Sequence, residues 1–507
     1  MEREAAGPRN GETIEADLCL VGAGPAGLAI ASALAGGGRN VLLLESGGID
    51  AEEGASVLNA GAVTGDRYAG LRETRHRQVG GTAAIWNTRT RSGVGAKFTP
   101  LDPIDFETRQ AVAHSGWPFS FNQLVPWYTR AQELCGLGRF DYDAATWARA
   151  NREPLAELPG VESRVYHFGT RDVLLEPMLR AVHAGSNVRL VPDATVTRLE
   201  ADRTGGRVIR ARVASRRGSS WWVAANEFVL CGGAIENARL LLCSGHDAAG
   251  LGNRSGGVGR CFMEHPRDRT LSLRVLDRGG YRRLAFYDLY GEAEREVAGR
   301  LAIAERTLRE ENLLNASATL LPIVREPARR MREVLGPLGR RAPFDQLLPR
   351  GGFGWSRHRL PTAVFEGFTV LLNLEQAPDP ENRITLGRDR DGFDVPRAEL
   401  HWRWRPADER SRQRVRALFA TALEAAGVGV VRQREGTVDP NAHHHAGTTR
   451  MHADPALGVV NADCRVHELE NVHIAGASVF PTAGFANPAL TIIALALRLA
   501  DHLDVRR

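Results

Sequence analysis

The sequence of 507 residues is almost without lysine: Lys97 is the only one, and arginine supplies the rest of the basic side chains. The net charge is +5, and acidic residues are interleaved with the arginines along the whole chain. A nucleic-acid-binding protein concentrates its positive charge on one face or in one segment. The arginine content is therefore a bias of composition, and we expect no nucleic-acid partner.

Cysteine is also scarce, and the six cysteines are scattered without a C-x-x-C pair. This spacing argues against a structural zinc site and against a disulfide framework. No apolar run is long enough for a membrane-spanning helix, and the polar N-terminal segment lacks the hydrophobic core of a signal peptide. We therefore expect a cytoplasmic protein without a membrane span.

What the sequence does contain is a buried-strand pattern that runs into a glycine turn, "DLCLVGAGPAGLAIASALA". Gly22, Gly24 and Gly27 form G-x-G-x-x-G, with Pro25 and Ala26 at the start of the expected helix. The three glycines allow, in order, a tight turn, close approach to a pyrophosphate, and close packing of helix on strand. The N-terminus of the helix offers free N–H groups and a positive dipole end to phosphates.

A second strand, "RNVLLLE", ends at Glu45 and completes a βαβ unit typical of dinucleotide binding. A carboxylate at this place accepts a hydrogen bond from a ribose 2′-hydroxyl and disfavours the 2′-phosphate of NADP. The unit alone does not distinguish NAD from FAD, because both molecules carry ADP.

Further strand patterns occur near residues 188–230 and 472–475, far from the first unit along the chain. Such late strands predict one sheet assembled from distant segments. From about Arg267 to Gly427, short strand-like runs alternate with arginine-rich helical segments. This change of pattern predicts a separate domain with an antiparallel sheet.

Eight motifs, taken in order, resemble those of the glucose-methanol-choline (GMC) flavoprotein oxidoreductases along nearly the whole chain. They are "GAGPAG" with Glu45, "VGGTAAIWN", "GGAIENARLLL", "GRCFMEHP", "EQAPDPENRITL", "HHHAGTTRMH", "GVVNADCRV" and "NPALTIIALALRLAD". The "NPALT" segment is most similar to the sugar-oxidising branch around pyranose oxidase, in which Asn replaces a second His.

The resemblance implies an α/β fold: a Rossmann-like FAD-binding domain and a second, antiparallel-sheet substrate domain similar to that of p-hydroxybenzoate hydroxylase. We expect a flexible tail at residues 1–15. The predicted FAD-binding domain comprises residues 16–100, 186–265 and 435–507. The predicted substrate-binding domain and cap comprise residues 101–185 and 266–434.

The resemblance also implies the residues that contact FAD beyond the first βαβ unit. They are Gly80, Gly81, Thr82, Trp86 and Asn87 near the isoalloxazine and pyrophosphate, Val196 at the adenine, Gly233 and Ala234 at the adenosine, Gly476 and Ala477 at the ribityl-pyrophosphate, and Pro488, Ala489 and Leu490 at a helix start that faces the N1/C2=O edge. Ile85 stands where pyranose oxidases carry a flavin-linked His, so the predicted FAD is non-covalent.

Three consecutive histidines, His443, His444 and His445, precede Gly447-Thr448, and alignment on that pair places the catalytic base at His444. A neutral imidazole, with an ordinary pKa of about 6.5, accepts a hydroxyl proton near neutral pH. Asn487 would orient the hydroxyl, cap the helix that follows, or do both. In an extended segment His443 and His445 would face away from His444, and their roles stay open. No nearby carboxylate completes a metal-ligand set, so no metal is expected.

The function that the resemblance implies is FAD-dependent oxidation of an alcohol of a sugar, glycoside, aminosugar or polyol, with O2 or another electron acceptor. The alternatives are oxidation of a non-sugar alcohol, a non-redox lyase of the same family, and a nicotinamide-dependent dehydrogenase. An FAD-binding protein without turnover fits poorly with both His444 and Asn487 present. A cationic aminosugar would require carboxylates in the pocket, for which Glu264 and Glu375 are the candidates.

Overall fold

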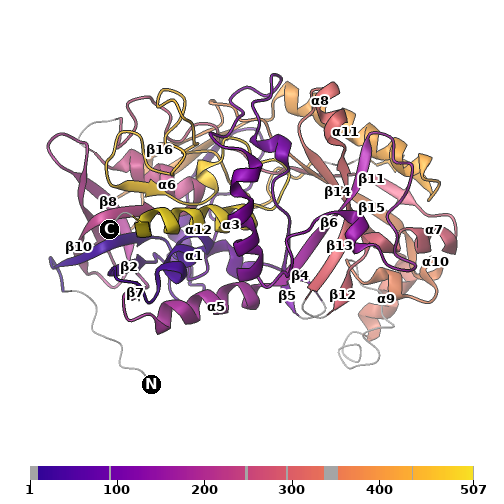
Figure 1. The fold of residues 1–507 in the computed structure, drawn as a ribbon, viewed down its shortest axis with the longest axis horizontal. Helices are drawn as coiled ribbons and strands as arrows, with labels where there is room; N and C mark the ends of the chain where they lie inside the picture. Colours follow the sequence, from indigo (N-terminus) through magenta and orange to yellow (C-terminus); the bar gives the residue numbers. More distant parts are fainter. Residues whose placement is uncertain are drawn as a thin grey trace.

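Two sheets of different kinds form the two lobes of the molecule (Figure 1). The computed structural model describes residues 9–90, 93–245, 249–292, 295–335, 352–434, 436 and 438–505. Within these ranges, one sheet has seven strands, another has nine, and a small third sheet has three.

The seven-stranded sheet is assembled from segments far apart in the chain, as predicted. Its order is β7 (Val188–Val191), β2 (Val41–Leu44), β1 (Thr13–Val21), β10 (Ser220–Leu230), β9 (Val208–Ala214) and β8 (Thr195–Ala201), with β19 (Val472–Ile474) also paired to β10. β7, β2, β1, β10 and β19 run parallel, and β8 to β10 form an antiparallel meander. The continuous apolar run of β2 is buried throughout, as is usual for a parallel strand covered on both faces.

Helices α1 (Pro25–Leu34), α12 (Ala489–Val505) and α3 (Phe121–Leu134) pack in succession on this lobe, and α5 (Arg171–Ala184) lies against α1. Strand β1 begins at Thr13, inside the range predicted as a tail, because it pairs with β10 from that residue onward. Residues 1–8 of that tail lie outside the described residues.

The nine-stranded sheet forms the second lobe. Its order is β18 (Val430–Gln433), β11 (Arg267–Arg274), β15 (Phe365–Leu374), β14 (Ala316–Val324), β13 (Arg295–Ile303), β6 (Val161–Thr170), β5 (Val94–Phe98) and β4 (Thr88–Arg89), with β12 (Tyr290–Glu292) paired to β13. Its described pairings are all antiparallel. Strands β4 and β5 fall within residues 16–100, which the sequence assigned to the other domain. The chain thus crosses between lobes earlier than expected.

The third sheet consists of β16 (Arg383–Arg390), β17 (Pro396–Trp402) and β3 (Ala62–Gly65). It lies against α6 (Gly233–Cys243) on the first lobe (Figure 1). Residues 383–402 were predicted within the substrate domain, but Ile384, Ala398 and Leu400 belong to the hydrophobic core of the first lobe. None of the helices in the described part of the chain combines the length and apolar character that a bilayer crossing demands.

Candidate active site

One open cavity connects the first glycine turn with the three histidines. It is bordered by both large sheets, since β1, β2 and β8 contribute residues at one end and β5 at the other. The predicted site residues that line it are Gly22, Gly24, Pro25, Ala26, Glu45, Gly81, Thr82, Trp86, Val196, Gly233, Ala234, His444, Gly476, Ala477, Asn487, Pro488 and Ala489.

Four predicted residues, Gly27, Gly80, Asn87 and Leu490, do not line the cavity. A Cβ on Gly27 would lie 2.0 Å from the carbonyl oxygen of Gly22, so this glycine is required for packing of α1 on the turn. Gly80 has a left-handed φ of +88°, and its N–H donates to the Ala23 carbonyl at 2.9 Å. Leu490 is buried in α12, and Asn87 is exposed.

At three cavity-lining positions, packing within the protein does not explain why the residue is glycine. A Cβ added to Gly24, Gly233 or Gly476 would meet no atom within 4 Å. Their main chain is therefore open to a ligand along one side of the cavity, which is what close approach to a dinucleotide requires. The residues present thus fit the ADP half of FAD.

Glu45 directly follows β2, and each of its two carboxylate oxygens accepts a hydrogen bond from a backbone N–H. Oε2 accepts from the Ala23 N–H at 2.9 Å, and Oε1 accepts from the Gly47 N–H at 2.8 Å. Burial raises the pKa of this carboxyl, and the two N–H donors oppose that rise. Glu45 thus holds the glycine turn in place, and the remaining lone pairs of its carboxylate are available for a ribose hydroxyl.

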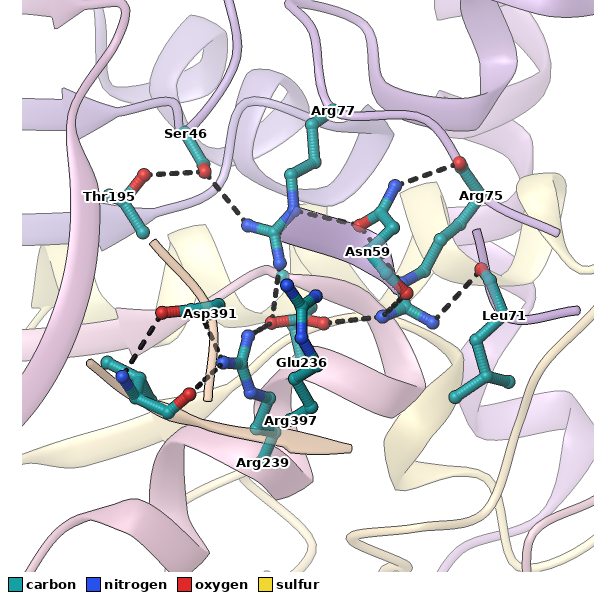
Figure 2. Close-up of polar contacts among 12 residues, drawn as sticks. Ser46, Asn59, Leu71, Arg75, Arg77, Thr195, Glu236, Arg239, Asp391 and Arg397 are labelled. Atoms are coloured by element: carbon teal, nitrogen blue, oxygen red, sulfur yellow. Dashed lines mark hydrogen bonds and ion pairs between the residues drawn. The ribbon is translucent and has the colours of Figure 1, made fainter. Parts of the chain in front are cut away.

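A largely buried cluster of charged residues, which the sequence did not reveal, centres on Glu236 in the first turn of α6 (Figure 2). Its Oε1 accepts from Arg75 at 2.7 Å, and its Oε2 lies 2.7 Å from Arg77 and 3.2 Å from Arg239. Arg239 also pairs with Asp391 at 2.6 Å. All five side chains belong to residues that line the cavity.

This Glu236 cluster carries three guanidinium groups against two carboxylates. Burial disfavours the ionised form of Glu236, but Arg77, Arg239 and Arg75 outweigh that effect and hold its pKa below the ordinary value. One positive charge is left over in the wall of the cavity, where it suits a diphosphate. No local motif marks the cluster, because its members come from three separate segments of the chain.

At the other end of the cavity, Glu264 fixes the backbone of the histidine segment. Its Oε1 accepts from the His444 N–H at 3.0 Å and from the Tyr68 hydroxyl at 3.2 Å. Its Oε2 accepts from the His265 N–H at 2.7 Å and the Ala442 N–H at 3.1 Å. Glu264 is fully buried, and burial raises its pKa. It therefore positions His444 and does not line the cavity.

The tautomer of His444 follows from its contact with His265, whose Nδ1 lies 2.9 Å from the Nδ1 of His444. The Nε2 of His265 lies 3.2 Å from the Ala483 carbonyl, an acceptor, and so must carry a proton. In a neutral His265, Nδ1 then has a free lone pair, and the His444 Nδ1–H donates to it. The remaining nitrogen of His444, Nε2, is left unprotonated.

That free Nε2 of His444 lies 3.3 Å from the side-chain Nδ2 of Asn487. Asn487 therefore directs its amide at the base. Helix α12 begins at Ala489, and the Pro488 carbonyl accepts from the Ile492 N–H at 2.9 Å, so the helix starts one residue later than predicted. Burial, followed by the charges of His265, Arg267 and Lys97, holds the pKa of His444 well below 6.5.

The extended conformation predicted for the three histidines is wrong at His443, which has a left-handed φ of +62°. The alternation of sides is therefore lost, and His443, His444 and His445 all line the same cavity. His443 places Nδ1 3.0 Å from the Thr74 carbonyl, and the His445 ring packs on Phe262. Within the described ranges, no three His, Cys, Asp or Glu side chains are grouped as metal ligands.

Comparisons with known proteins agree with this geometry. Residues 378–496 match the family model of GMC oxidoreductases, and residues 17–254 match that of FAD-dependent oxidoreductases. The two-lobed fold and the dinucleotide cavity thus belong to an FAD-dependent oxidoreductase that acts on CH–OH groups. The chain thus combines an FAD-dependent oxidoreductase domain with a C-terminal domain of the GMC oxidoreductase type, and the predicted α/β fold and FAD cofactor are confirmed.

Two curated relatives and one solved structure illustrate the family. The chain is 26% identical to 6'''-hydroxyparomomycin C oxidase of Streptomyces lividus, with 97% of this chain and 92% of that protein covered. It is 25% identical to pyranose 2-oxidase of Lyophyllum shimeji over 59% of this chain and 47% of that one. The crystal structure of pyridoxine 4-oxidase from Mesorbium loti superposes with a TM-score of 0.60 at 19% identity, covering 97% and 99% of the two chains.

Proposed function

We propose that this enzyme oxidises a hydroxyl group of a sugar, glycoside, aminosugar or polyol to a carbonyl, with His444 as the base. The observation that carries the proposal is the unprotonated Nε2 of His444 at 3.3 Å from the Asn487 amide. FAD, when bound in the cavity, supplies the hydride acceptor at flavin N5. A substrate hydroxyl placed beside Nε2 and the amide would meet one acceptor and one donor.

His444 removes the hydroxyl proton as the C–H bond breaks, and Asn487 donates to the oxygen on which negative charge develops. The acceptor must be neutral before the reaction. Burial favours the neutral ring, because it holds the pKa of His444 below the ordinary value. The Nδ1–H···Nδ1 bond to His265 keeps the reactive nitrogen facing Asn487 throughout.

The preference for a sugar is supported by the names of the relatives, two of which are a hydroxyparomomycin oxidase and a pyranose oxidase. The proposed FAD is non-covalent, because Ile85 occupies the position of the linking histidine. A non-sugar alcohol and a cyanohydrin-cleaving lyase are the alternatives, and no relative named above is a lyase. The proposed location is the cytoplasm, which cell fractionation tests.

Anaerobic mixing of the purified, flavin-loaded protein with a panel of sugars and polyols tests the proposal. We expect at least one to bleach the flavin, and His444→Gln to slow bleaching by 10²- to 10⁴-fold while retaining FAD. His452→Gln, a nearby histidine that does not line the cavity, is the control. Bleaching of His444→Gln at the wild-type rate would refute the base. Cyanohydrin cleavage without bleaching by any alcohol would favour the lyase.

A further inference from the structure

The single lysine of the chain lies at the reaction end of the cavity. Lys97, on β5, lines the same cavity as His444 and Asn487. Its ammonium is 4.3 Å from the ring centroid of Tyr166. With the residues that the structure describes, the ammonium forms neither a hydrogen bond nor an ion pair. An ammonium in such a place retains donors for a ligand.

A second cationic side chain, that of Arg300 on β13, lies on the same face of the nine-stranded sheet as Lys97. Lys97 pairs with Phe168 on β6, and Tyr166 pairs with Ala298 on β13. Alternate residues of a strand share a face, so Lys97, Tyr166 and Arg300 all face the same side.

The guanidinium of Arg300 lies 5.5 Å from the centroid of Tyr166 and 4.5 Å from that of Phe485, two residues before Asn487. Arg300 is only 1% exposed, and its Nε and Nη1 have no hydrogen-bond partner among the described residues. Its Nη2 lies 3.5 Å from an oxygen of Asp102. Two cations thus flank one tyrosine, and they keep unused donors.

Among the described residues that line the cavity, no carboxylate at the reaction end balances Lys97. Of the two candidates for binding a cationic substrate, Glu264 accepts four hydrogen bonds from its own surroundings. Glu375 is bidentate on Arg109 and also accepts from the Asn315 N–H at 2.7 Å. The acidic residues that do line the cavity, Glu45, Glu236 and Asp391, hold partners at the nucleotide end.

We propose that Lys97 binds an oxyanion of the substrate, and that Lys97 with Arg300 selects sugar acids or sugar phosphates over cationic aminosugars. This inference rests on the proposed function, because it concerns the substrate of the same site. A carboxylate or phosphate gains a charge-assisted hydrogen bond from the ammonium, and the bond is strong where water is excluded. An ammonium group of an aminosugar would meet two like charges and no free acceptor, which disfavours binding.

Because the chain has one lysine, an amine-reactive reagent reports on Lys97 without interference from other side-chain amines. The flavin-loaded enzyme is labelled by reductive methylation in the presence of glucose, glucuronate, glucose 6-phosphate or glucosamine, and the Lys97 peptide is quantified by mass spectrometry. We expect glucuronate or glucose 6-phosphate to reduce the labelling of Lys97 at least tenfold. The anion that protects better shows whether the site prefers a carboxylate or a phosphate. Protection by glucose equal to that by the two anions would overturn the proposal.

The same four sugars then serve in anaerobic flavin reduction by three variants. In Lys97→Met we expect the preference for the better anion over glucose to fall at least tenfold, and in Lys97→Arg to persist. Arg306→Met, which removes a positive charge from the exposed helix α8 (Glu305–Glu310), is the matched control. An unchanged preference in Lys97→Met, or an altered flavin reduction potential with an unchanged preference, would refute the role of Lys97 toward substrate.

Failure of the proposed function would look different. If no alcohol bleached the flavin, the labelling experiment would still show whether Lys97 binds an oxyanion in the cavity. Conversely, suppose that glucosamine bleached the flavin and that neither anion changed the labelling of Lys97. This result would support the proposed oxidase function and refute the oxyanion site at Lys97.

Discussion

The Nδ1 atoms of His444 and His265 lie 2.9 Å apart and share one proton between the buried ring of His265 and the partly buried His444. Because His265 donates its other N–H to the Ala483 carbonyl, the proton in this contact belongs to His444. As a result, the His444 nitrogen that faces Asn487, Nε2, is the one with the free lone pair, and it can accept a proton from the substrate. His265 therefore positions the base without lying on the cavity.

Replacing His265 tests this arrangement with a matched pair of variants. In His265→Gln, the amide can accept from His444 and donate to Ala483, so the tautomer is preserved. In His265→Leu it is not, and we expect flavin reduction to slow by roughly 10- to 100-fold, as for other residues that orient a reactive imidazole. Rapid-mixing spectroscopy under anaerobic conditions gives the rates.

The pH profile separates positioning from packing in the same pair. His265 is one of the groups that lower the pKa of His444. Its loss in His265→Leu should raise the pKa of His444 and so move the acid limb of the pH profile of flavin reduction to higher pH. His265→Gln also removes the ring and should move the limb in the same direction, but it preserves the tautomer of His444 and so should keep the maximal rate. If both variants lose the same rate with unshifted limbs, His265 contributes packing alone.

Asn487 is expected to act as a donor, and Asn487→Asp converts it to an acceptor of the same shape. A carboxylate beside His444 Nε2 stabilises the imidazolium and raises its pKa. Flavin reduction should then be nearly lost near pH 6 and recover in part at alkaline pH. Asn487→Ala lacks the charge, so its limb should stay in place while the rate falls. Identical pH profiles for the two variants would contradict the donor role.

The parts of the site that could be predicted from sequence are those whose geometry is local. The glycine turn and Glu45 belong to one βαβ unit, and the chain itself brings them together. His444 and Asn487 were found through motifs that resemble a family, not through spacing, since a segment of 42 intervening residues separates them. Their contact, like the assembled first sheet, follows from the return of late segments to β1 and β10.

The unpredicted residues depend on long-range pairing. Lys97 joins the site because β5 pairs with β6 in the other lobe. Glu236 contacts Arg75 and Arg77, which come from a segment far from it in the chain. The orientation of His443 was missed for a different reason: a single left-handed φ is not marked by a glycine. Strand patterns predicted β16 and β17 but not the lobe on which they pack, since this is decided by the apolar face of α6.

Glu236→Gln should weaken both the fold and FAD binding. The substitution leaves the largely buried Arg75, Arg77 and Arg239 with Asp391 as their remaining carboxylate in the cluster (Figure 2). Loss of one partner from a buried ion network costs about 3–5 kcal/mol. Thermal unfolding and the fluorescence of released FAD measure the two effects. Arg75→Gln in the Glu236→Gln background removes one repelling charge and should restore part of the stability; no recovery would argue against the electrostatic account.

The buried histidines predict a loss of stability in mild acid, with a sign that can be worked out. Burial lowers the pKa of His265 to about 4 and that of His445 to about 3. Between pH 6.5, the ordinary value, and these lowered values, the unfolded chain binds protons that the folded chain excludes. The free energy of unfolding therefore falls as pH falls through this window, by up to about 1.4 kcal/mol per pH unit for each histidine.

Urea unfolding of the flavin-loaded protein between pH 8 and pH 5 measures this slope. His445→Gln cannot be protonated and should give a shallower dependence below pH 6.5, so that its stability relative to the wild type improves as the solution becomes more acidic. His183→Gln, on the exposed side of α5, is the control, because it removes a histidine that lies at the surface. A wild-type curve parallel to that of His445→Gln would mean that His445 is protonated in the folded enzyme. In that case the carboxylate of Glu264, 3.5 Å from its Nε2, would have to be its partner.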